Sequence, residues 1–484
     1  MKLAEELNGK KILIWGFGRE GQSTLRFISS HCSDCVVDVA DSDSEVVAEG
    51  IHEVIATPLG THPNLEGYDY IFKSPGIPLL GLSHEESKRL TSQTQMFMDC
   101  YRDQIIGITG TKGKSTTASL TAHILSKCGK DAILVGNIGL PCFDFADRIR
   151  EETIIVFELS CHQLEQLMTS PRTAVILNLY PDHLDHYETF DKYAAAKLHI
   201  FTYQMPGDRV LVNEQIFCRM GSEAAVNCST IWQALNIEVC VARNENASEE
   251  HEELDTIREV LPEATLDVSA RTVHVKDETF DIAPEDTELQ GLHNVYNISV
   301  VYYLCHELYG VERNGFFEAL KSFEGLPHRL MNVGTFDGVT YYDDSISTVC
   351  ETAIQAVNSI ENATVLIVGG MDRGISYTEL VEYLPKSNLK NVLLLPDTGK
   401  RILSECNERF SDSISVHLPK LTLCRNMADA VSKAAKMGRP GEAVVLSPAA
   451  ASYGFYKDFA ERGDDFARLV KEYYGGSGDE AEET

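Results

Sequence analysis

The sequence contains no stretch of about 18 consecutive apolar residues, the length that a transmembrane helix needs. Its N-terminus also lacks an apolar signal core, because it reads Met-Lys-Leu-Ala-Glu-Glu-Leu-Asn. From these two absences we expect no insertion into a membrane and a protein that stays in the cytosol.

Basic residues are scarce. The chain has 42 lysines and arginines against 73 aspartates and glutamates, which gives a formal charge of −31 at pH 7. Nucleic acids and anionic membranes both require a basic footprint, so neither is expected as a partner. Anionic substrates would need lysine, arginine or Mg²⁺ at their site to overcome the field of the whole chain.

Paired cysteines are also missing, since the thirteen cysteines are an odd number scattered over a long chain. Only Cys32 and Cys35 have CxxC spacing, and neither a second pair nor a nearby histidine ligand set accompanies them. The pattern predicts reduced thiols, without a zinc or redox centre.

The length of 484 residues exceeds what one compact core supports and predicts about three domains. Apolar segments alternate with helical patterns and polar loops, which favours the α/β class. We expect a Rossmann-like domain at 1–100, a P-loop ATPase-like domain at 101–325, and a second Rossmann-like domain at 326–474. The glycine-rich, acidic segment 475–484 has nothing to bury and is expected to be a disordered tail.

The stretch Ile105-Ile-Gly-Ile-Thr-Gly-Thr-Lys-Gly-Lys-Ser-Thr-Thr117 predicts a phosphate-binding loop between a strand and a helix. Glycines free backbone N–H groups for phosphate oxygens, a lysine neutralises them, and a hydroxyl can ligate Mg²⁺. A standard P-loop has glycine where this chain has Ile108, so the loop is a shortened relative. Its candidate nucleotide-binding residues are Gly110, Thr111, Lys112, Gly113, Lys114, Ser115 and Thr116.

Near the N-terminus, Gly16, Gly18 and Gly21 give the GxGxxG spelling after the apolar run Lys11-Ile-Leu-Ile-Trp15. Asp41 follows about twenty residues later, as in Rossmann domains. The turn favours a diphosphate-containing ligand at the helix N-terminus; the alternative is a turn whose glycines serve packing only. The loop after Tyr70-Ile-Phe-Lys73 is expected at the same sheet edge.

Further strands are predicted at 132–135, 154–158 and 174–178 in the central region, each followed by polar residues that imply one active edge. After a helix through Val300–His306, Gly325-Leu-Pro-His-Arg329 reads as a hinge. Strands predicted beyond the hinge are 340–342, 364–369, 391–395 and 443–447. Residues 217–285 are acidic and poorly diagnostic, and the run Ser248–Glu253 reads as a solvated face.

The order of these motifs resembles the Mur ligases, ATP-dependent enzymes that add amino acids in peptidoglycan synthesis, and in particular the branch that adds glutamate to UDP-N-acetylmuramoyl-L-alanine. The resemblance covers nearly the whole chain. Besides the two glycine-rich turns, it is carried by Gly136-Asn-Ile-Gly139, Glu158-Leu-Ser-Cys-His-Gln-Leu-Glu165, Asp182-His-Leu-Asp185, Tyr193-Ala-Ala-Ala-Lys197, His293-Asn-Val-Tyr-Asn297, Gly325-Leu-Pro-His-Arg329, Asp343-Asp-Ser345 and Ser447-Pro-Ala-Ala-Ala-Ser452.

The resemblance implies that ATP converts the alanine carboxylate to an acyl phosphate, which the amine of glutamate then attacks. Lys114, His183 and Lys197 are its implied catalytic residues. Lys197 is implied to be carbamylated by CO₂, which needs the neutral amine. The implied Mg²⁺ ligands are Ser115, Thr116, Glu158, His183 and Lys197.

The resemblance also implies substrate contacts. Asn294, Arg329 and Asp344 match ATP-binding positions, and Arg329 lies in the hinge, so domain closure is expected to complete the ATP site. The UDP-linked substrate is implied to contact Gly18, Glu20, Gly21, Gln22, Ser23, Ser74, Gly76, Asn137, Ser160 and His183. Glutamate is implied to contact Thr348, Arg373, Ser452 and Phe459.

The chain departs from the family pattern in one place: the D-glutamate-adding branch has Asp-Ser-Lys where this chain has Asp344-Ser345-Ile346. The missing cation leaves a substrate carboxylate to be paired in another way, and Arg373 is the candidate. This spelling also resembles a branch that adds L-glutamate, so both isomers stay open, with D-glutamate favoured by the size of its branch.

Three other functions each explain only part of the sequence. A hydride-transferring dehydrogenase explains GxGxxG but leaves Lys114, Lys197 and Arg329 without a task. A folate polyglutamate ligase would not need the N-terminal domain, and a non-catalytic nucleotide-binding protein would not need intact Lys114, Glu158, His183 and Lys197. We expect a monomer that acts on small molecules.

Overall fold

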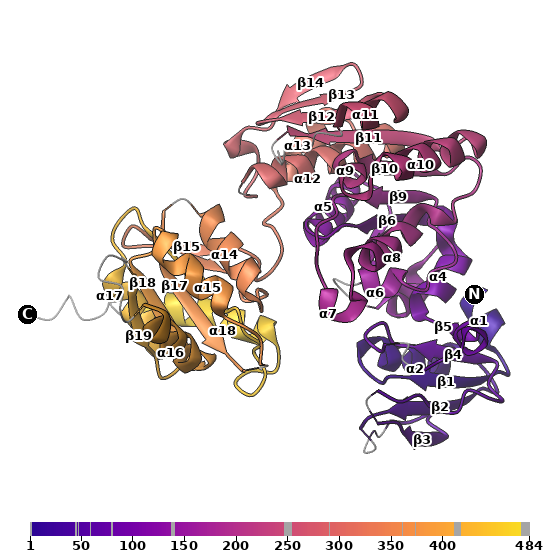
Figure 1. Ribbon diagram of the computed structural model, residues 1–484, viewed down its shortest axis with the longest axis horizontal. Coiled ribbons are helices and arrows are strands. Elements are labelled where there is room, and N and C mark those ends of the chain that lie inside the picture. Colours follow the sequence, from indigo (N-terminus) through magenta and orange to yellow (C-terminus); the bar gives the residue numbers. More distant parts are fainter. Residues whose placement is uncertain are drawn as a thin grey trace, which may run out of the picture. The chain divides into compact units, whose positions relative to one another are not determined.

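The computed structural model describes residues 2–43, 46, 48–58, 60–78, 81–136, 141–245, 254–289, 291–360, 362–372, 374–410 and 418–475. The chain divides into two compact units, Met1–Thr287 with Leu292–Phe323 and Glu288–Gly291 with Glu324–Thr484 (Figure 1). Asn137, Arg373, the run Ser248–Glu253 and the tail from 476 lie outside the described residues.

The first unit begins with a parallel sheet whose central strands are buried runs of β-branched and apolar residues. Its strands lie side by side in the order β3 (Glu53–Ala56), β2 (Val36–Asp41), β1 (Lys11–Trp15), β4 (Tyr70–Lys73) and β5 (Leu90–Thr91). The helices of this region are α1 (Lys2–Leu7), α2 (Arg19–His31), α3 (His84–Ser87) and α4 (Gln93–Tyr101).

A second, larger sheet of the same unit is parallel from β7 to β12 and ends in an antiparallel extension. The order of its strands is β14 (Glu278–Asp281), β13 (Thr272–Val275), β12 (Ala264–Ser269), β11 (Glu238–Asn244), β10 (Arg209–Asn213), β9 (Thr173–Ile176), β6 (Ile105–Thr109), β8 (Ile154–Glu158) and β7 (Ala132–Gly136).

Helices connect and cover this sheet. They are α5 (Lys114–Lys127), α6 (Cys161–Leu164), α7 (Leu184–Tyr187), α8 (Phe190–Thr202), α9 (Gln215–Met220), α10 (Ser222–Ala234), α11 (Leu254–Val260), α12 (Leu292–Tyr302) and α13 (Arg313–Lys321). A π-helical segment, Tyr303–Leu308, continues α12, and 3₁₀ turns span Arg102–Gln104, Cys142–Arg148 and Pro284–Asp286.

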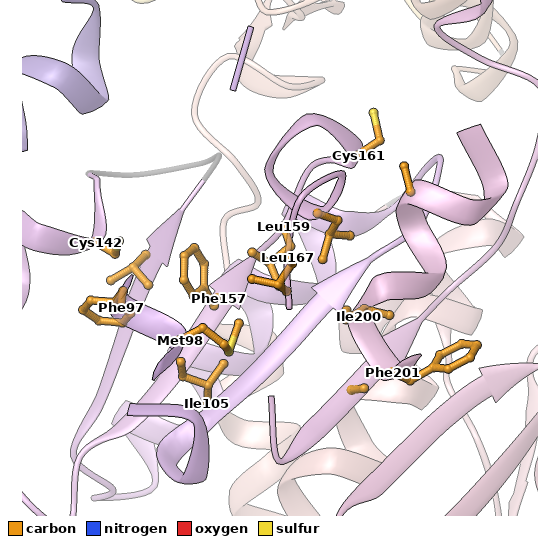
Figure 2. Packing of buried hydrophobic residues seen from close by; sticks show 14 of the residues in the cluster. Phe97, Met98, Ile105, Cys142, Phe157, Leu159, Cys161, Leu167, Ile200 and Phe201 are labelled. Carbon is orange, nitrogen blue, oxygen red and sulfur yellow. The ribbon is translucent and has the colours of Figure 1, made fainter. Parts of the chain in front are cut away.

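The cores of the two sheets in the first unit are continuous. One cluster of buried side chains includes Ile12 of β1, Phe97 of α4 and Phe157 of β8. Figure 2 shows Phe97 beside Phe157, and their rings meet edge to face with centroids 5.7 Å apart. Because aromatic contacts of this kind stabilise beyond the area they bury, α4 joins the two sheets firmly.

The second unit contains a sheet in the order β15 (Met331–Phe336), β16 (Val339–Asp343), β20 (Ala443–Leu446), β17 (Ala363–Gly370), β18 (Asn391–Asp397) and β19 (Lys420–Leu423). Only β15 pairs antiparallel among these strands. One face packs on α14 (Cys350–Ser359), α15 (Thr378–Tyr383) and α16 (Thr398–Phe410). The other face packs on α17 (Met427–Met437) and α18 (Phe459–Gly475).

The predicted α/β class, with three sheets built mainly of parallel strands, is confirmed. The predicted strands are present with ends shifted by one or two residues, as at β9 and β17. The undiagnostic region 217–285 contains β11 to β14. The domain boundaries stay a prediction, because contacts divide the chain into two units and group both N-terminal sheets together.

All thirteen cysteines are free thiols, as predicted. Among the described residues, the search for a helix of sufficient length and apolarity to cross a bilayer finds none.

Candidate active site

The loop predicted to bind phosphate, called the phosphate-binding loop below, lies between β6 and α5, as its sequence predicts. Gly113 caps α5 in the left-handed region, with φ of 82°. A Cβ atom at this position would lie 2.6 Å from Oδ1 of Asn297 on α12. Gly113 is therefore required both by its backbone conformation and by the close approach of α12.

Neighbouring strand ends hold the loop in shape. Lys112 N donates to Oδ1 of Asn178 at 2.8 Å, and Thr111 N donates to the carbonyl of Asn178 at 3.1 Å. The hydroxyl oxygens of Thr111 and Tyr193 lie 2.9 Å apart within hydrogen-bond distance. These contacts come from the segment after β9 and from α8, so two elements outside the loop fix its shape.

Lys114 is folded back over the loop. Its Nζ donates to the carbonyl oxygens of Gly110 and Thr111, both at 2.9 Å. The ammonium group therefore lies where the backbone N–H groups of the same loop would hold a phosphate.

Glu158 ends β8 beside the loop and is fully buried. The hydroxyl of Ser115 donates to its Oε1 at 3.1 Å, and Thr116 follows at the start of α5. A buried carboxylate next to serine and threonine hydroxyls is a set of hard oxygen donors that suits Mg²⁺. Gly136, at the end of β7, leaves room here, because its Cβ would lie 2.3 Å from the Glu158 carbonyl.

Lys197 lies on α8 and is 1% exposed. Its Nζ donates to the Gly110 carbonyl at 2.8 Å and lies 5.1 Å from the ring centroid of Tyr193. Burial and then the charge of Lys114 lower the pKa of Lys197 to about 7. A substantial fraction of this amine is therefore neutral near neutral pH.

His183 has a left-handed backbone, with φ of 52°, and precedes α7. Its backbone N donates to Oδ1 of Asp182 at 2.9 Å, and its ring centroid lies 5.1 Å from that of His162. The side chain is 47% exposed, so it is open to a ligand.

A cleft of about 430 Å³ brings many of the predicted residues together. Glu20 and Gly76 line it from the first sheet, while Lys114, Ser160, His183 and Lys197 line it from the central sheet. Sequence reasoning missed Arg19, His162, Asp182 and Tyr193, which also line the cleft. All four lie inside motifs that the sequence had already singled out, which was the available signal.

The GxGxxG turn combines the features of both alternatives: one of its glycines is needed for packing, and the turn leads into the N-terminus of a helix. A Cβ on Gly21 would lie 2.2 Å from the Gly16 carbonyl, so this glycine is needed for packing. Gly18 caps α2 without a side-chain hydrogen bond at the cap. The Ser74 hydroxyl donates to the Gly16 carbonyl at 2.9 Å, which ties the loop after β4 to the turn.

Ser23 behaves differently from the residues around it. It is fully buried, and its hydroxyl donates to Oδ1 of Asp144 at 2.9 Å while accepting from Nε2 of Gln93 at 3.1 Å. In this structure Ser23 links α2 to the central region, and its contact with a substrate stays a prediction.

Asn294 lies on α12, where its Oδ1 accepts from Nδ2 of Asn297 at 3.0 Å. Since Asn297 adjoins Gly113, the paired asparagines are on the side of α12 that faces the phosphate-binding loop. This placement agrees with a nucleotide contact for Asn294, although the contact itself stays a prediction.

The second unit carries the remaining predicted residues. Asp344 is buried, and its Oδ2 accepts from the Ser447 hydroxyl at 2.7 Å. Burial raises the pKa of Asp344 to about 6. Arg329 is exposed, Thr348 is half-buried, Ser452 is buried and Phe459 is 37% exposed.

A buried arginine that the sequence did not reveal supports this region. Nε and Nη2 of Arg462 donate to the hydroxyl and carbonyl of Ser345 at 2.9 and 2.8 Å, and Nη1 donates to the Ala450 carbonyl at 3.0 Å. Ser345 in turn donates to the Phe459 carbonyl at 2.8 Å. Arg462 therefore connects the loops that hold Asp344, Ser452 and Phe459.

His328, in the predicted hinge, forms the other buried contact. Its Nδ1 lies 2.7 Å from Oδ2 of Asp343, and Gly463 leaves the space for this pair, because a Cβ there would lie 2.2 Å from the same nitrogen. The hydrogen bond to Asp343 raises the pKa of His328 above its ordinary value, against the effect of burial.

Comparisons with known proteins agree with this geometry. Residues 108–305 match the model of the Mur ligase middle domain. The UDP-N-acetylmuramoylalanine–D-glutamate ligase of Salinibacter ruber is 30% identical over 490 residues, which cover 96% of this chain and 99% of that protein. The enzyme of the same name from Clostridioides difficile is 30% identical over 478 residues, covering 95% and 98%.

Solved structures support the fold. The UDP-N-acetylmuramate–alanine ligase MurC from Thermotoga maritima has a TM-score of 0.54 at 16% identity, over 97% of this chain and 100% of that one. The chain belongs to the Mur ligase family, whose members are ATP-dependent ligases. Within that family, the two relatives above are both named as ligases of D-glutamate.

Replacing Gly113 by alanine should weaken ATP binding by more than about tenfold, because the new methyl group would collide with Asn297 and strain the loop. Titration calorimetry with ATP and Mg²⁺ measures the affinity. Gly129→Ala is the matched control, since Gly129 follows the other end of α5 with φ of 77° and has nothing within 4 Å of its Cβ position. Equal losses in both variants would contradict the steric explanation.

Replacing His328 by glutamine should destabilise the protein more at about pH 6 than at about pH 8. The raised pKa means that the folded state binds the proton more tightly than the unfolded chain. This stabilisation is full below the unfolded pKa and is lost as pH rises through the folded pKa. Thermal melting of both proteins across this range measures it, with exposed His274→Gln as control; a deficit that grows with pH would contradict the pairing with Asp343.

Proposed function

We propose that this protein ligates glutamate to the alanine carboxylate of UDP-N-acetylmuramoyl-L-alanine at the expense of ATP, with D-glutamate as the favoured isomer. One observation carries the proposal. A single cleft is lined by the phosphate-binding Lys114 and by residues of the N-terminal GxGxxG turn and the loop after β4. A nucleotide-linked carboxylate and the phosphates of ATP would meet in such a cleft.

The first step would form an acyl phosphate, because a carboxylate is a poor electrophile and needs a better leaving group. The alanine carboxylate attacks the γ-phosphorus of ATP, and ADP leaves. Two anions must approach each other for this step, so the ammonium of Lys114 is the group that reduces their repulsion. Ser115, Thr116 and Glu158 would hold Mg²⁺, which supplies further positive charge to the phosphates when bound.

The second step would form the amide bond. The neutral amine of glutamate attacks the acyl carbon, phosphate leaves, and the nitrogen loses a proton. Removal of water from the cleft would protect the acyl phosphate from hydrolysis. Thr348, Arg373, Ser452 and Phe459 stay the predicted contacts of glutamate, and Arg329 and Asp344 the predicted contacts of the nucleotide.

Lys197 fits the proposed carbamate. Carbamylation joins a neutral amine to CO₂ and releases a proton, so it requires the amine to be unprotonated. Burial and Lys114 lower the pKa of Lys197 to about 7, which supports this requirement. The product would be an anion beside Lys114, in place of a second cation.

L-Glutamate is the second candidate substrate, because Ile346 is present where the D-glutamate-adding branch has lysine. Ile346 is half-buried, and its backbone N donates to the His328 carbonyl at 3.1 Å. Nothing in this contact replaces the missing ammonium group.

We also propose that the protein acts as a monomer and that it acts in the cytoplasm, where ATP and UDP-linked precursors are available.

The purified protein should release ADP only when ATP, Mg²⁺, UDP-N-acetylmuramoyl-L-alanine and glutamate are all present. A coupled assay with each glutamate isomer measures the reaction and its stereochemistry. We expect D-glutamate to be used. Activity with L-glutamate alone would keep the ligase and correct the isomer, whereas no amino-acid-dependent ADP with either isomer would overturn the proposed function.

Lys197→Ala should lose more than about 90% of activity and recover part of it with added acetate or formate, since a small carboxylate can replace the carbamate. ¹³C NMR of the wild-type protein with ¹³C-bicarbonate should show a carbamate signal that the variant lacks. Exposed Lys192, on the same helix, provides the control variant Lys192→Ala. The absence of both the recovery and the signal would contradict carbamylation.

A further inference from the structure

A buried lysine supports the side of the cleft that the first sheet forms, here called the N-terminal wall and lined by Arg19, Glu20, Pro75 and Gly76. Lys73 ends β4 and is 4% exposed. Its Nζ donates to the carbonyl oxygens of Ser74 at 3.0 Å and Ile77 at 2.7 Å. Pro75 and Gly76, between those two residues, line the cleft. Lys73 therefore holds the turn that forms this part of the wall.

A carboxylate occupies the same wall. Glu20 is in the first turn of α2, lines the cleft, and accepts a hydrogen bond from Nε2 of Gln163 at 2.9 Å. Oε1 of Gln163 accepts from the backbone N and the hydroxyl of Ser160, both at 3.0 Å. This chain of hydrogen bonds joins α2 of the first sheet to α6 of the central region along the cleft.

Glu20 and α2 act in opposite directions on a diphosphate. The exposed N–H groups at the start of a helix attract anions. A carboxylate in the first turn repels them, and reduced solvent contact strengthens the repulsion. Left uncompensated, the charge of Glu20 would weaken the anion site that the GxGxxG turn provides.

Two cations can compensate this charge, because Arg19 and the turn that Lys73 holds line the same cleft as Glu20. Burial raises the pKa of Glu20, whereas the hydrogen bond from Gln163 and the charges of Lys73 and Arg19 favour its ionised form. Burial lowers the pKa of Lys73 to about 8, against the charges of Glu165 and Glu20. Buried charges persist when opposite charges are near, so Lys73 and the two carboxylates depend on one another.

We propose that Lys73 is a positioning residue for the UDP-linked substrate: it offsets the carboxylate of Glu20 and fixes the turn at Ser74–Ile77, so that the start of α2 can hold a diphosphate. The inference rests on the proposed function, because it takes the UDP group as the ligand of this turn. Lys73 acts through Glu20 and the turn, without touching the diphosphate.

The test is a double-mutant cycle in the full-length protein, with binding of UDP-N-acetylmuramoyl-L-alanine measured by titration calorimetry and KM measured in the ADP-release assay. Lys73→Met should weaken binding about tenfold, while KM for ATP changes less than about twofold. Adding Glu20→Gln to Lys73→Met should restore at least about half of the lost binding free energy, since it removes the carboxylate that lost its partner. Lys73→Arg should bind nearly as well as the wild type.

Glu20→Gln alone covers the case in which Lys73→Met does not fold. The substitution keeps the backbone N–H of residue 20, through which the implied substrate contact is made, and removes a like charge, so the variant should bind the UDP-linked substrate as tightly as the wild type or up to about fivefold more tightly. Lys88→Met is the control, since Lys88 is an exposed lysine of the same region paired with Glu85.

The binding measurements distinguish a failure of the proposed ligase function from a failure of the proposed role of Lys73. If the wild-type protein does not bind the UDP-linked substrate, the proposed function fails. If it binds and Lys73→Met binds equally well, the role of Lys73 is overturned. A loss in Lys73→Met that Glu20→Gln does not restore, or a loss in Glu20→Gln alone, would overturn the electrostatic account.

Discussion

A single carbonyl oxygen, that of Gly110, accepts hydrogen bonds from two ammonium groups, Lys114 at 2.9 Å and Lys197 at 2.8 Å. The buried Lys197 and the half-buried Lys114 repel each other at this distance, which is why the charge of Lys114 contributes to the low pKa of Lys197. The arrangement is tolerable because Glu158 and Asp182 are nearby and because anionic phosphates are the expected ligands. Positive charge is thus concentrated at one turn of a strongly acidic protein, and the rest of the cleft is arranged around it.

The fold explains how residues from distant parts of the chain reach that turn. β6, β8 and β9 are parallel neighbours, so Thr109, Glu158 and Asn178 all lie at or just beyond the same edge of the sheet. The first sheet joins this edge through side chains as well as through the core, since Gln163 reaches Glu20 and Asp144 reaches Ser23. A substrate with a nucleotide at one end and a carboxylate at the other can therefore lie across both sheets within one unit.

Much of this arrangement could be predicted from the sequence, because strand ends and glycine-rich turns are local signals. Lys114, Ser115 and Glu158 follow apolar runs that can only be buried strands, and the sheet edge then brings them together. The burial of Lys197 could not be predicted from α8, whose pattern allows an exposed lysine; only the resemblance to a family indicated it. The strands β11 to β14 were missed because their apolar residues are mixed with charged and polar ones, as in Glu238–Asn244 and Glu278–Asp281, and do not form a continuous apolar run.

Buried polar contacts of charged side chains were the part of the structure that the sequence predicted least. Arg462 donates to Ser345, which lies 117 residues earlier in the chain. Lys73 donates to two carbonyl oxygens of the loop that follows it. In the sequence, both Arg462 and Lys73 look like ordinary surface cations. Burial decides such roles, and burial depends on packing that no local pattern specifies. Ser23 is a further example, because it is fully buried although Gly18 and Arg19, at the start of the same helix, are exposed.

The contact between Gly113 and Asn297 has a consequence for how this family can change over time. The amide of Asn297 occupies the space that any side chain at 113 would need, and the two residues lie on different helices far apart in the chain. A side chain at 113 would collide with Asn297, and the positive φ of Gly113 would strain it even if residue 297 were smaller. A constraint on the loop at 110–113 is therefore also a constraint on position 297 of α12, although the two segments are far apart in the chain.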